Sequence, residues 1–390
     1  FGLSQPENQT AQLFFSQNFP KFILKYPFEK QMRWEKYQFI RPIKWVLSLY
    51  GSESIPMILL DTESRSVSRL LQGQAEIPVQ SVEAYDDMIQ QNGILLSGQS
   101  RESAIRSHFT SESCPPRSSV VTENASRTEV PVVVEAIFPE KFIQLPGEVI
   151  ETVLSSQMKC FPMYKDSGNQ LTNHFRFVMN GYRDRETVKK GFEKVMTARL
   201  SDAAYFYEQD HKIPFSSRNG KLSSVLFMEK LGTMDQKVQR ISLIAEKLAS
   251  FPEIQRLPEL LTVISLYKVD LTTLLVQELT ELQGAVGRIY SKEAGIDQSI
   301  ALAIEESYQP KSEEDALPHS DLGRMISLLD RWDTWIGVHC IGLSLSSSGD
   351  PLGIRRTVNG LLRILMEKPG NIPLETYVDS AITAYQQING

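Results

Sequence analysis

Basic and aromatic side chains alternate along residues 32–45. Lysine and arginine side chains in such a stretch can neutralise phosphates, and flat aromatic rings can stack on unpaired bases. The stretch therefore indicates contact with a nucleic acid, and the alternative interpretation is an ordinary solvated face. The candidate phosphate contacts are Arg33, Arg41 and Lys44, and the candidate stacking rings are Trp34, Tyr37 and Phe39.

A second basic group follows a break in the chain. Arg355 and Arg356 come after Gly349-Asp350-Pro351, where a helix is expected to begin. Arginine is unfavourable beside the positive N-terminal end of a helix macrodipole, which favours acids. A bound phosphate would remove this misfit, so the pair is a second candidate for contact with a polyanion.

The acidic side chains of the C-terminal half suggest an alternative, a metal-dependent phosphohydrolase. Such a site requires several His and Asp ligands that converge on one ion. None of the five histidines is followed by an aspartate, so we predict no metal site. In the structural interpretation Asp270 caps a helix, while Asp330 and Asp333 pair with Arg324 or Arg331. The acids under consideration are Asp270, Glu278, Glu281, Asp330 and Asp333.

Signatures of nucleophilic catalysis and of phosphate-binding loops are absent from the sequence. It has no Gly-x-Ser-x-Gly and no glycine-rich loop that ends in Gly-Lys-Ser or Gly-Lys-Thr. Cys160 lies in a predicted strand, with His174 as the nearest histidine in sequence. Packing in the core is the expected role of its thiol. We therefore predict no catalytic residue in this chain.

The longest predicted element is a helix within the stretch Val188–Phe215. Apolar residues recur there with the 3.6-residue period of a helix that buries one face. Arg199 and Asp202 lie at the edge of that face, where they can pair, and the helix must stop before Pro214. It is predicted to join two domains, because strands and turns precede it and helices follow. The apolar positions are Phe192, Val195, Met196, Leu200, Ala203, Phe206 and Tyr207.

Residues 1–185 are predicted to form a mixed α/β domain. Its expected elements are a strand or short helix at 43–49, strands at 55–60 and 130–138, a β-hairpin with arms at 159–164 and 174–180, and helices at 78–92, 101–109 and 148–158.

Residues 186–370 are predicted to form an all-helical domain, and residues 371–390 to start a further segment that is cut short. Asp270–Gly284 has the clearest helical pattern, and Gly284 is expected to end it. The other predicted helices are at 221–231, 235–250, 297–308, 322–338 and 354–366, and residues 259–267 form a further apolar run in this domain.

Composition is that of a globular protein with room for two cores. The chain has 390 residues, of which 41% are hydrophobic and 23% charged. No apolar run approaches the roughly 20 residues that span a bilayer. Cys114, Cys160 and Cys340 are far apart, as expected in a reducing compartment. We therefore predict a cytoplasmic protein with no membrane partner.

Charge is distributed unevenly although the formal net charge is −6. Cations concentrate in residues 1–44, and acids concentrate in residues 297–333. This arrangement is typical of a protein that meets a polyanion on one side and a protein partner on another, and the alternative is two solvated faces.

Short stretches spread in order over nearly the whole chain match one known family. They are Met32–Trp34, Phe39–Trp45, Leu145–Val149, Ala198–Ala203, Glu229–Gly232, Asp235–Val238, Glu281–Gly284 and Asp350–Arg356. These stretches resemble the beta subunit of bacterial tetrameric glycyl-tRNA synthetase. The sequence departs from the usual pattern of that family at Ser68–Leu70, Ser156–Phe161 and Ser307-Tyr308.

The resemblance implies a division of labour. In that family the alpha subunit forms glycyl-adenylate from glycine and ATP, with magnesium as its metal ion, while the beta subunit binds tRNA and is needed for transfer. The implied fold is an editing-like domain over 1–185, similar to that of phenylalanyl-tRNA synthetase, followed by a helical domain over 186–370 similar to histidine–aspartate phosphohydrolases. The anticodon-binding domain of the family is missing, so truncation is expected, and fusion of alpha and beta would explain the abrupt start.

The first hypothesis is therefore a non-catalytic, tRNA-binding part of glycyl-tRNA synthetase, with no cofactor of its own. Its expected partners are glycine tRNA and the catalytic alpha subunit. The alternatives are a metal-dependent phosphohydrolase and an assembly scaffold with little RNA affinity. The residues predicted to contact tRNA or another domain are Arg33, Arg41, Lys44, Lys159, Arg199, Arg355 and Arg356.

Overall fold

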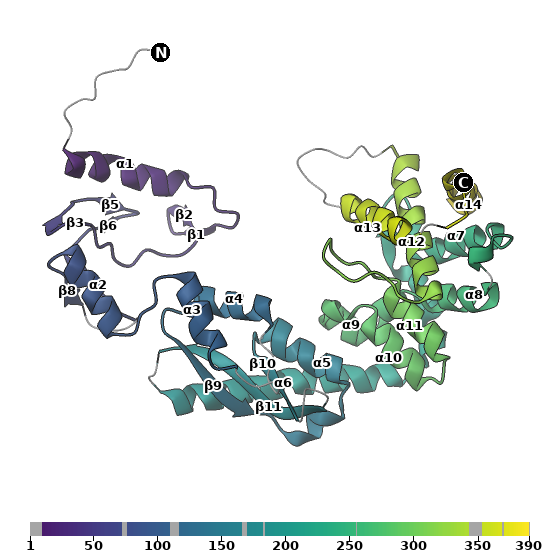
Figure 1. Cartoon of the computed structure of the whole chain (residues 1–390), viewed down its shortest axis with the longest axis horizontal. Helices are drawn as coiled ribbons and strands as arrows, with labels where there is room; N and C mark the ends of the chain where they lie inside the picture. Colours follow the sequence, from purple (N-terminus) through teal and green to yellow (C-terminus); the bar gives the residue numbers. More distant parts are fainter. Residues whose placement is uncertain are drawn as a thin grey trace, which may run out of the picture. The chain divides into compact units, whose positions relative to one another are not determined.

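Figure 1 shows the computed structural model of the chain, with the described elements coloured along the sequence. The predicted hairpin turn, most of the stretch before Arg355, and Cys114 lie outside the described residues. The model describes residues 10–71, 76–109, 117–165, 170–181, 184–254, 256–342, 353–368 and 370–389.

The chain divides into two compact units. The first unit comprises residues 1–135 and 176–188, and the second comprises residues 136–175 and 189–390. Three elements, β9 (Pro131–Ile137), β11 (Gln170–Asn180) and α6 (Arg185–His211), contribute residues to both units. The predicted boundaries at 185 and 370 stay predictions.

The first unit begins with a helix and a series of short antiparallel strand pairs. The helix is α1 (Ala11–Lys25), which contains Pro20 and has no buried residue. The strand or short helix expected at 43–49 is replaced by a two-residue strand at Leu49–Tyr50, and the strand expected at 55–60 is reduced to two residues at Ile58–Leu59. The pairs are β1 (Met32–Trp34) with β2 (Tyr37–Phe39), β3 (Leu49–Tyr50) with β4 (Glu53–Ser54), β5 (Ile58–Leu59) with β6 (Thr62–Glu63), and β7 (Val67–Ser68) with β8 (Ile77–Pro78).

Three helices follow in the first unit. They are α2 (Val82–Gln91), α3 (Gly98–Arg106) and α4 (Ser118–Arg127). The first two confirm the helices predicted at 78–92 and 101–109, whereas α4 was not predicted. The Arg101 guanidinium joins α3 to α4, because it donates hydrogen bonds to the carbonyl oxygens of Leu95 at 2.6 Å and Ala125 at 2.7 Å.

A three-stranded sheet has the order β10-β11-β9, with β10 at Phe161–Lys165. The strand expected at 130–138 and both arms of the predicted hairpin are confirmed. The helix expected at 148–158 is α5 (Gly147–Thr152), which follows the short 3₁₀ helix η1 (Glu140–Gln144) and continues into the π-helical turn η2 (Val153–Gln157). Cys160 is fully buried, which confirms its predicted place in the core and raises the pKa of its thiol.

The predicted long helix is α6, which ends at His211 and so stops before Pro214 as expected. Met196, Leu200 and Ala203 are buried on the predicted apolar face, but Val195 is 47% exposed. The role of α6 as a joint between domains stays a prediction.

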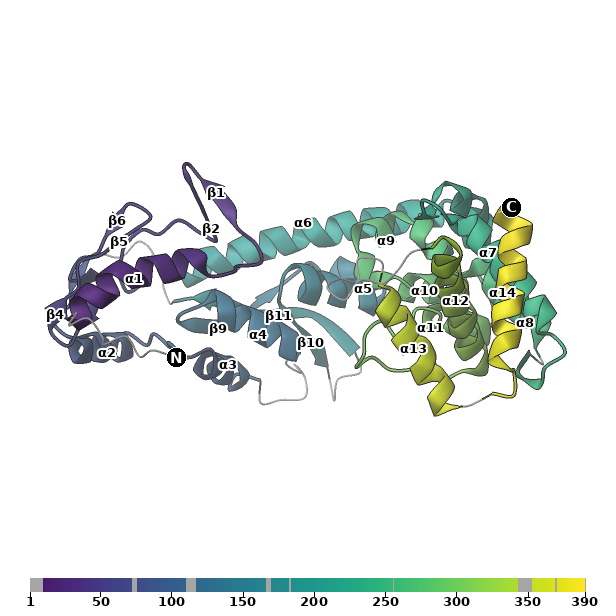
Figure 2. The same ribbon diagram turned by 90° about the horizontal axis from the view of Figure 1, so that it is seen from above.

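The rest of the second unit is mainly helical, and no helix in the described ranges combines the length and apolar character needed to cross a membrane. Figure 2 shows α14 beside α7, and α14 also packs against α12. It covers most of the segment predicted to follow the helical domain. The helices are α7 (Met234–Lys247), α8 (Leu257–Leu266), α9 (Leu274–Glu278), α10 (Ala285–Glu293), α11 (Gln298–Glu306), α12 (Asp321–Cys340), α13 (Ile354–Glu367) and α14 (Leu374–Asn389).

The helix predicted at 221–231 is wrong. This region holds the 3₁₀ helix η4 (Phe215–Ser224) and the antiparallel strands β12 (Leu226–Met228) and β13 (Gly232–Thr233). Gly232 reverses the chain with φ of +84°, a backbone conformation that glycine adopts without strain.

The helix predicted over Asp270–Gly284 is also wrong, because the chain breaks into η6 (Val269–Thr272), α9 and η7 (Thr280–Leu282). The Thr273 hydroxyl accepts a hydrogen bond from the amide of Val276 at 3.3 Å and so starts a separate helix. Asp270 does not cap a helix of its own. Its buried carboxylate accepts from the amide of Gly284, the residue before α10, at 2.7 Å.

Candidate nucleic-acid interface

The β1–β2 hairpin and the segment after it carry the first predicted basic group. Arg33, Arg41 and Lys44 are all exposed. Arg33 lies opposite Gln38 in the register of the hairpin, while Trp34 lies opposite Tyr37. Directly opposed residues share a face and neighbours along a strand alternate, so Arg33 and these two rings lie on opposite faces.

The aromatic rings of this hairpin hold it together. The indole N–H of Trp34 donates to the carbonyl oxygen of Phe39 at 3.1 Å. The Phe39 ring meets the Phe28 ring edge to face, with centroids 5.3 Å apart. Trp34, Tyr37 and Phe39 are half-buried. Stacking of these rings on bases stays a prediction, and the structure gives them a structural role as well.

The cations of the hairpin differ in their partners. Lys36, at the turn, forms an ion pair with Asp61, which raises the pKa of the lysine and lowers that of the carboxyl. Arg33 donates to the carbonyl oxygen of Glu35 at 3.2 Å. Arg41 and Lys44 form no ion pair with any residue that the structure describes. They are therefore the cations of this stretch best placed to meet an external anion.

Lys159 and Arg199 lie in the second unit. Lys159 is half-buried, with φ of +54°, in the short link between η2 and β10. Arg199 is an exposed residue of α6 and lines a narrow hollow together with Asp202 and Glu278. Arg199 and Asp202 are both described and no ion pair joins them, so the structure does not bear out the pairing that was the alternative role of Arg199. The two carboxylates make this hollow less favourable to phosphate than the hairpin surface.

Arg355 and Arg356 are exposed in the first turn of α13, as predicted, and this turn contains no acidic residue. Gly353 precedes the helix with φ of +67°, and the Arg356 guanidinium lies over it. Asp350, Pro351 and Leu352 of the predicted motif lie outside the described residues. The seven predicted contacts are thus divided between the two units, with Arg33, Arg41 and Lys44 in the first.

An ionic network inside the second unit was not predicted. We define it as Lys237, Arg240, Lys268, Asp330 and Asp333. The Lys237 ammonium lies 2.9 Å from Asp333 Oδ2 and 3.1 Å from Asp330 Oδ1, and Arg240 Nε lies 2.7 Å from Asp333 Oδ1. Lys268 Nζ lies 3.9 Å from Asp330 Oδ2. The predicted pairing of these acids with Arg324 or Arg331 is therefore wrong.

This network occupies Asp330 and Asp333, two of the five acids that the phosphohydrolase alternative would use. Asp333 is completely buried between two cations, and Asp270 is engaged by Gly284 and by the Tyr308 hydroxyl at 2.7 Å. Glu278 and Glu281 are exposed. Among the described residues no cluster of His, Cys, Asp and Glu has the arrangement of a metal site. The one sign of the ionic network in the sequence was the spacing of Asp330 and Asp333 on one apolar helix.

Comparison with known proteins gives one consistent family. The family model described as glycyl-tRNA synthetase beta subunit matches residues 3–389. The chain is 33% identical over 371 residues to the glycine–tRNA ligase beta subunit of Listeria monocytogenes serotype 4a, which covers 92% of this chain and 54% of that protein. It is 32% identical over 374 residues to the beta subunit of Lactobacillus helveticus, with 91% and 53% covered.

A plant protein is similar as well. The chain is 34% identical over 377 residues to a chloroplastic/mitochondrial glycine–tRNA ligase of Arabidopsis thaliana, which covers 94% of this chain and 35% of that protein. The chain spans about half the length of the bacterial relatives and about a third of the plant one. Because the family model matches nearly every residue, the chain belongs to the glycyl-tRNA synthetase beta subunit family.

Proposed function

We propose that this chain is the tRNA-binding part of a glycine–tRNA ligase, and that a catalytic alpha subunit or domain attaches the glycine. The observation that carries this proposal is family membership over residues 3–389. The bacterial relatives are named beta subunits of glycine–tRNA ligase, which supports an alpha subunit as the protein partner.

The exposed cations support the RNA-binding role. Arg41 and Lys44 are exposed and lack an acidic partner among the described residues, whereas the cations inside the second unit are held by Asp330 and Asp333. Exposed, unengaged cations can exchange counterions for RNA phosphates with little reorganisation. Arg33, Lys159, Arg199, Arg355 and Arg356 remain further candidates for contact with tRNA or with another domain.

The proposal also covers the kind of domain that each part of the chain forms and the need for cofactors. The first part of the chain would be an editing-like domain, and the helical part a phosphohydrolase-like scaffold whose acids neutralise buried cations. The chain would then need no cofactor of its own, and ATP and magnesium would serve the alpha subunit. The pairing of Asp333 with Lys237 and Arg240 supports this division of labour.

The test is direct binding of fluorescently labelled glycine tRNA, measured by anisotropy at low salt. The double variant Arg41→Ala/Lys44→Ala should weaken binding by about tenfold, since an exposed charge contact contributes up to about 1 kcal/mol. The matched control is Lys36→Ala. Its charge lies in the same stretch but is engaged by Asp61, so binding should change less than about twofold.

Equal weakening by the double variant and by Lys36→Ala would contradict a specific role for Arg41 and Lys44. Absence of tRNA binding by the wild-type chain, both alone and with the alpha subunit, would instead favour the assembly scaffold. If the chain is a scaffold, aminoacylation by the alpha subunit should still require it. An unrelated protein would leave aminoacylation unchanged.

A further inference from the structure

Helix α1 presents its large apolar side chains to solvent. Phe15, Phe19 and Phe22 are 40%, 45% and 63% exposed, and the helix has no buried residue. The half-buried positions of its first two turns are instead the polar residues Gln12 and Ser16. Soluble proteins rarely leave a contiguous apolar surface uncovered unless it binds something.

The exposed rings form a row along one face of α1. Phe15, Phe19 and Phe22 are spaced i, i+4 and i+7, which places successive residues about 5–6 Å apart along the helix axis. The rings of Phe19 and Phe22 are stacked, with centroids 6.5 Å apart and planes inclined by 27°. Flat, accessible rings of this kind can carry nucleobases, because every base has a π-face.

A row of positive charge runs beside the rings. Lys21 and Lys25 lie four positions apart and so share a face, and each directly precedes an aromatic residue, Phe22 and Tyr26. Both lysines are exposed and form no ion pair with any residue in the described ranges. The helix contains no acidic residue. Its charge is therefore complementary to a polyanion.

The row of rings continues into the β1–β2 hairpin (Figure 1). The ring of Tyr26, which is 52% exposed, lies 4.8 Å from that of Phe28 between centroids, and Phe28 in turn meets Phe39 of β2 at 5.3 Å. The same hairpin carries Arg33, one of the proposed tRNA contacts. The exposed face of α1 is therefore joined by ring contacts to the surface proposed to bind RNA.

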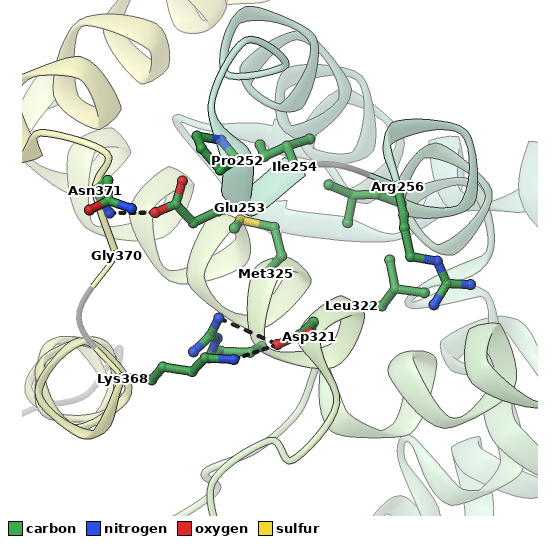
Figure 3. A pocket seen from close by; sticks show the side chains of 12 residues that line it. Pro252, Glu253, Ile254, Arg256, Asp321, Leu322, Met325, Lys368, Gly370 and Asn371 are labelled. Atoms are coloured by element: carbon green, nitrogen blue, oxygen red, sulfur yellow. Dashed lines mark hydrogen bonds and ion pairs between the residues drawn. The ribbon is translucent and has the colours of Figure 1, made fainter.

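The charged groups around a cavity in the second unit are, by contrast, engaged with one another (Figure 3). Lys368 and Arg324 lie 2.9 Å and 3.5 Å from the carboxylate of Asp321, and Arg256 lies 3.2 Å from that of Glu259. These ion pairs leave no excess of positive charge there for an external anion. The lysines of α1 differ in having no such partner.

We propose that α1 is a stacking platform for an unpaired segment of RNA. The bases lie on the rings of Phe15, Phe19 and Phe22, and the phosphates accept hydrogen bonds from the ammonium groups of Lys21 and Lys25. This inference rests on the proposed RNA-binding function and specifies which part of an RNA the first unit holds.

The geometry favours unpaired nucleotides over a duplex. In a double helix the bases are stacked on one another and only their edges are accessible, so they cannot cover the rings of α1. The rings of the hairpin that were predicted to stack on bases, Trp34, Tyr37 and Phe39, are half-buried and hold the hairpin together. Helix α1 thus offers the rings that a base can cover.

An apolar protein surface is the competing occupant. Such a partner would remove Lys21 and Lys25 from water together with the rings, and α1 supplies no carboxylate to compensate them. A single strand of RNA brings one phosphate with each base and so satisfies the rings and the lysines at once. Charge complementarity therefore favours RNA.

The test is binding of a fluorescently labelled, unstructured RNA of about 12 nucleotides, a length typical of single-strand sites, to the full chain. Anisotropy at low salt gives the affinity. The double variant Phe19→Ala/Phe22→Ala should weaken binding by at least about tenfold, because it removes two stacking surfaces. Circular dichroism verifies that the variant is folded, as expected for substitutions at exposed positions.

The matched control is Leu13→Ala/Leu24→Ala. These side chains are equally exposed, at 45% and 47%, and lie on the opposite side of the same helix from the rings. The control removes a similar apolar surface without touching the platform, so the affinity should stay within about twofold of the wild type.

Salt dependence separates the two rows. Lys21→Gln/Lys25→Gln should reduce the slope of the logarithm of affinity against the logarithm of salt concentration by about 1.4, which corresponds to two phosphate contacts of a single strand. Phe19→Ala/Phe22→Ala should leave this slope unchanged, because the phosphate contacts remain.

Three results would overturn the inference alone. They are binding of glycine tRNA but not of the single strand by the wild type, unchanged single-strand affinity in the ring variant, and equally tight binding of a duplex of the same sequence. The proposed function stands in each case if Arg41→Ala/Lys44→Ala still weakens tRNA binding. Absence of binding to every RNA would overturn both.

Two further arms detect other occupants of α1. The ring variant is tested for association with the alpha subunit and for sedimentation with vesicles of phosphatidylcholine and phosphatidylglycerol. A loss of either association, with single-strand affinity unchanged, would assign α1 to a protein or a membrane and would overturn the stacking platform.

Discussion

Single cations in this protein fall into two classes that differ in their partners. Lys237 and Arg240 are almost completely buried and are held by Asp333. Arg41 and Lys44 are exposed and have no acidic partner in the described part of the chain. Lysine and arginine therefore have two roles here. Lys237 and Arg240 form ion pairs in the interior, whereas Arg41 and Lys44 are available to an external anion.

The interior class should be important for stability. Asp333→Asn leaves Arg240 buried without a carboxylate and Lys237 with Asp330 alone, and breaking a buried pair in this way costs about 3–5 kcal/mol. We expect the urea midpoint of the second unit to fall accordingly, as followed by tryptophan fluorescence. Lys292→Ala is the exposed control and should change the free energy of unfolding by less than about 0.5 kcal/mol. A loss below about 1 kcal/mol for Asp333→Asn would show that the network is not needed.

The same network also affects how the free energy of unfolding changes at low pH. Burial alone would raise the pKa of Asp330, but the nearby cations Lys237, Lys268 and Arg331 outweigh it and lower the pKa from 3.8 to about 2. The ionised carboxylate therefore stabilises the fold above the unfolded-state pKa, and this contribution is lost as the pH falls from about 4 to about 2.

Asp330→Asn cannot titrate, so its stability should depend less on pH in that window. The measurement is the free energy of unfolding in urea at pH 5, 4, 3 and 2.5 for both proteins. The expected difference in slope is up to about 1.4 kcal/mol per pH unit, which corresponds to one proton. Parallel curves for the two proteins would show that Asp330 is not the group responsible.

Helix packing depends on glycine in one place on α12. A Cβ at Gly337 would overlap the hydroxyl of Tyr385 and would lie 2.5 Å from its Cζ. Tyr385 is 6% exposed and donates to the carbonyl oxygen of Asp333 at 3.0 Å, so the ring has little room to move. This contact brings α14 close to α12.

Gly337→Ala should therefore destabilise the protein by about 1–3 kcal/mol through overpacking, although alanine favours helix. Gly191→Ala is the matched control, since a Cβ there meets nothing within 4 Å in the exposed part of α6. It should stabilise the protein by about 0.4–1 kcal/mol. Thermal unfolding of both variants measures the difference, and a change of the same sign in both would contradict this account of the α12–α14 contact.

Regular elements were predictable where one pattern dominates. The apolar period of α6 and the valine-rich strand β9 are confirmed because burial follows the local sequence. The helix predicted over Asp270–Gly284 fails because Thr273 restarts the chain and Asp270 is engaged by Gly284, which is far along the sequence. The contact between Asp270 and Gly284 spans 14 residues and leaves no local signal, whereas the Thr273 cap is local and was outweighed in the prediction by the apolar pattern.

The candidate site could be predicted only in part for the same reason. Exposed arginines such as Arg355 stand out in a sequence, because a cation in a first helical turn is a local misfit. Asp333 has two partners, Lys237 and Arg240. They lie 96 and 93 positions before it in the sequence. Nothing in the sequence near Asp333 indicates them. The faces of the β1–β2 hairpin also depend on its register, which separates Arg33 from the rings of Trp34 and Tyr37.

At the scale of the whole molecule, function depends on where charge is placed. The formal net charge is −6, yet cations gather in the first 44 residues. An acidic protein can bind RNA through such a local surface, and its affinity must then fall steeply with salt. The chain covers 53–54% of the length of its bacterial relatives.

The most direct test of the central claim is the salt dependence of glycine tRNA binding. The logarithm of the association constant is plotted against the logarithm of salt concentration for the wild type, Arg41→Ala/Lys44→Ala and Lys36→Ala. Each lost phosphate contact should reduce the slope by about 1, so the double variant should lose about 2 and Lys36→Ala close to none. A wild-type affinity that ignores salt, or a slope unchanged in the double variant, would contradict the claim that these cations hold the RNA backbone.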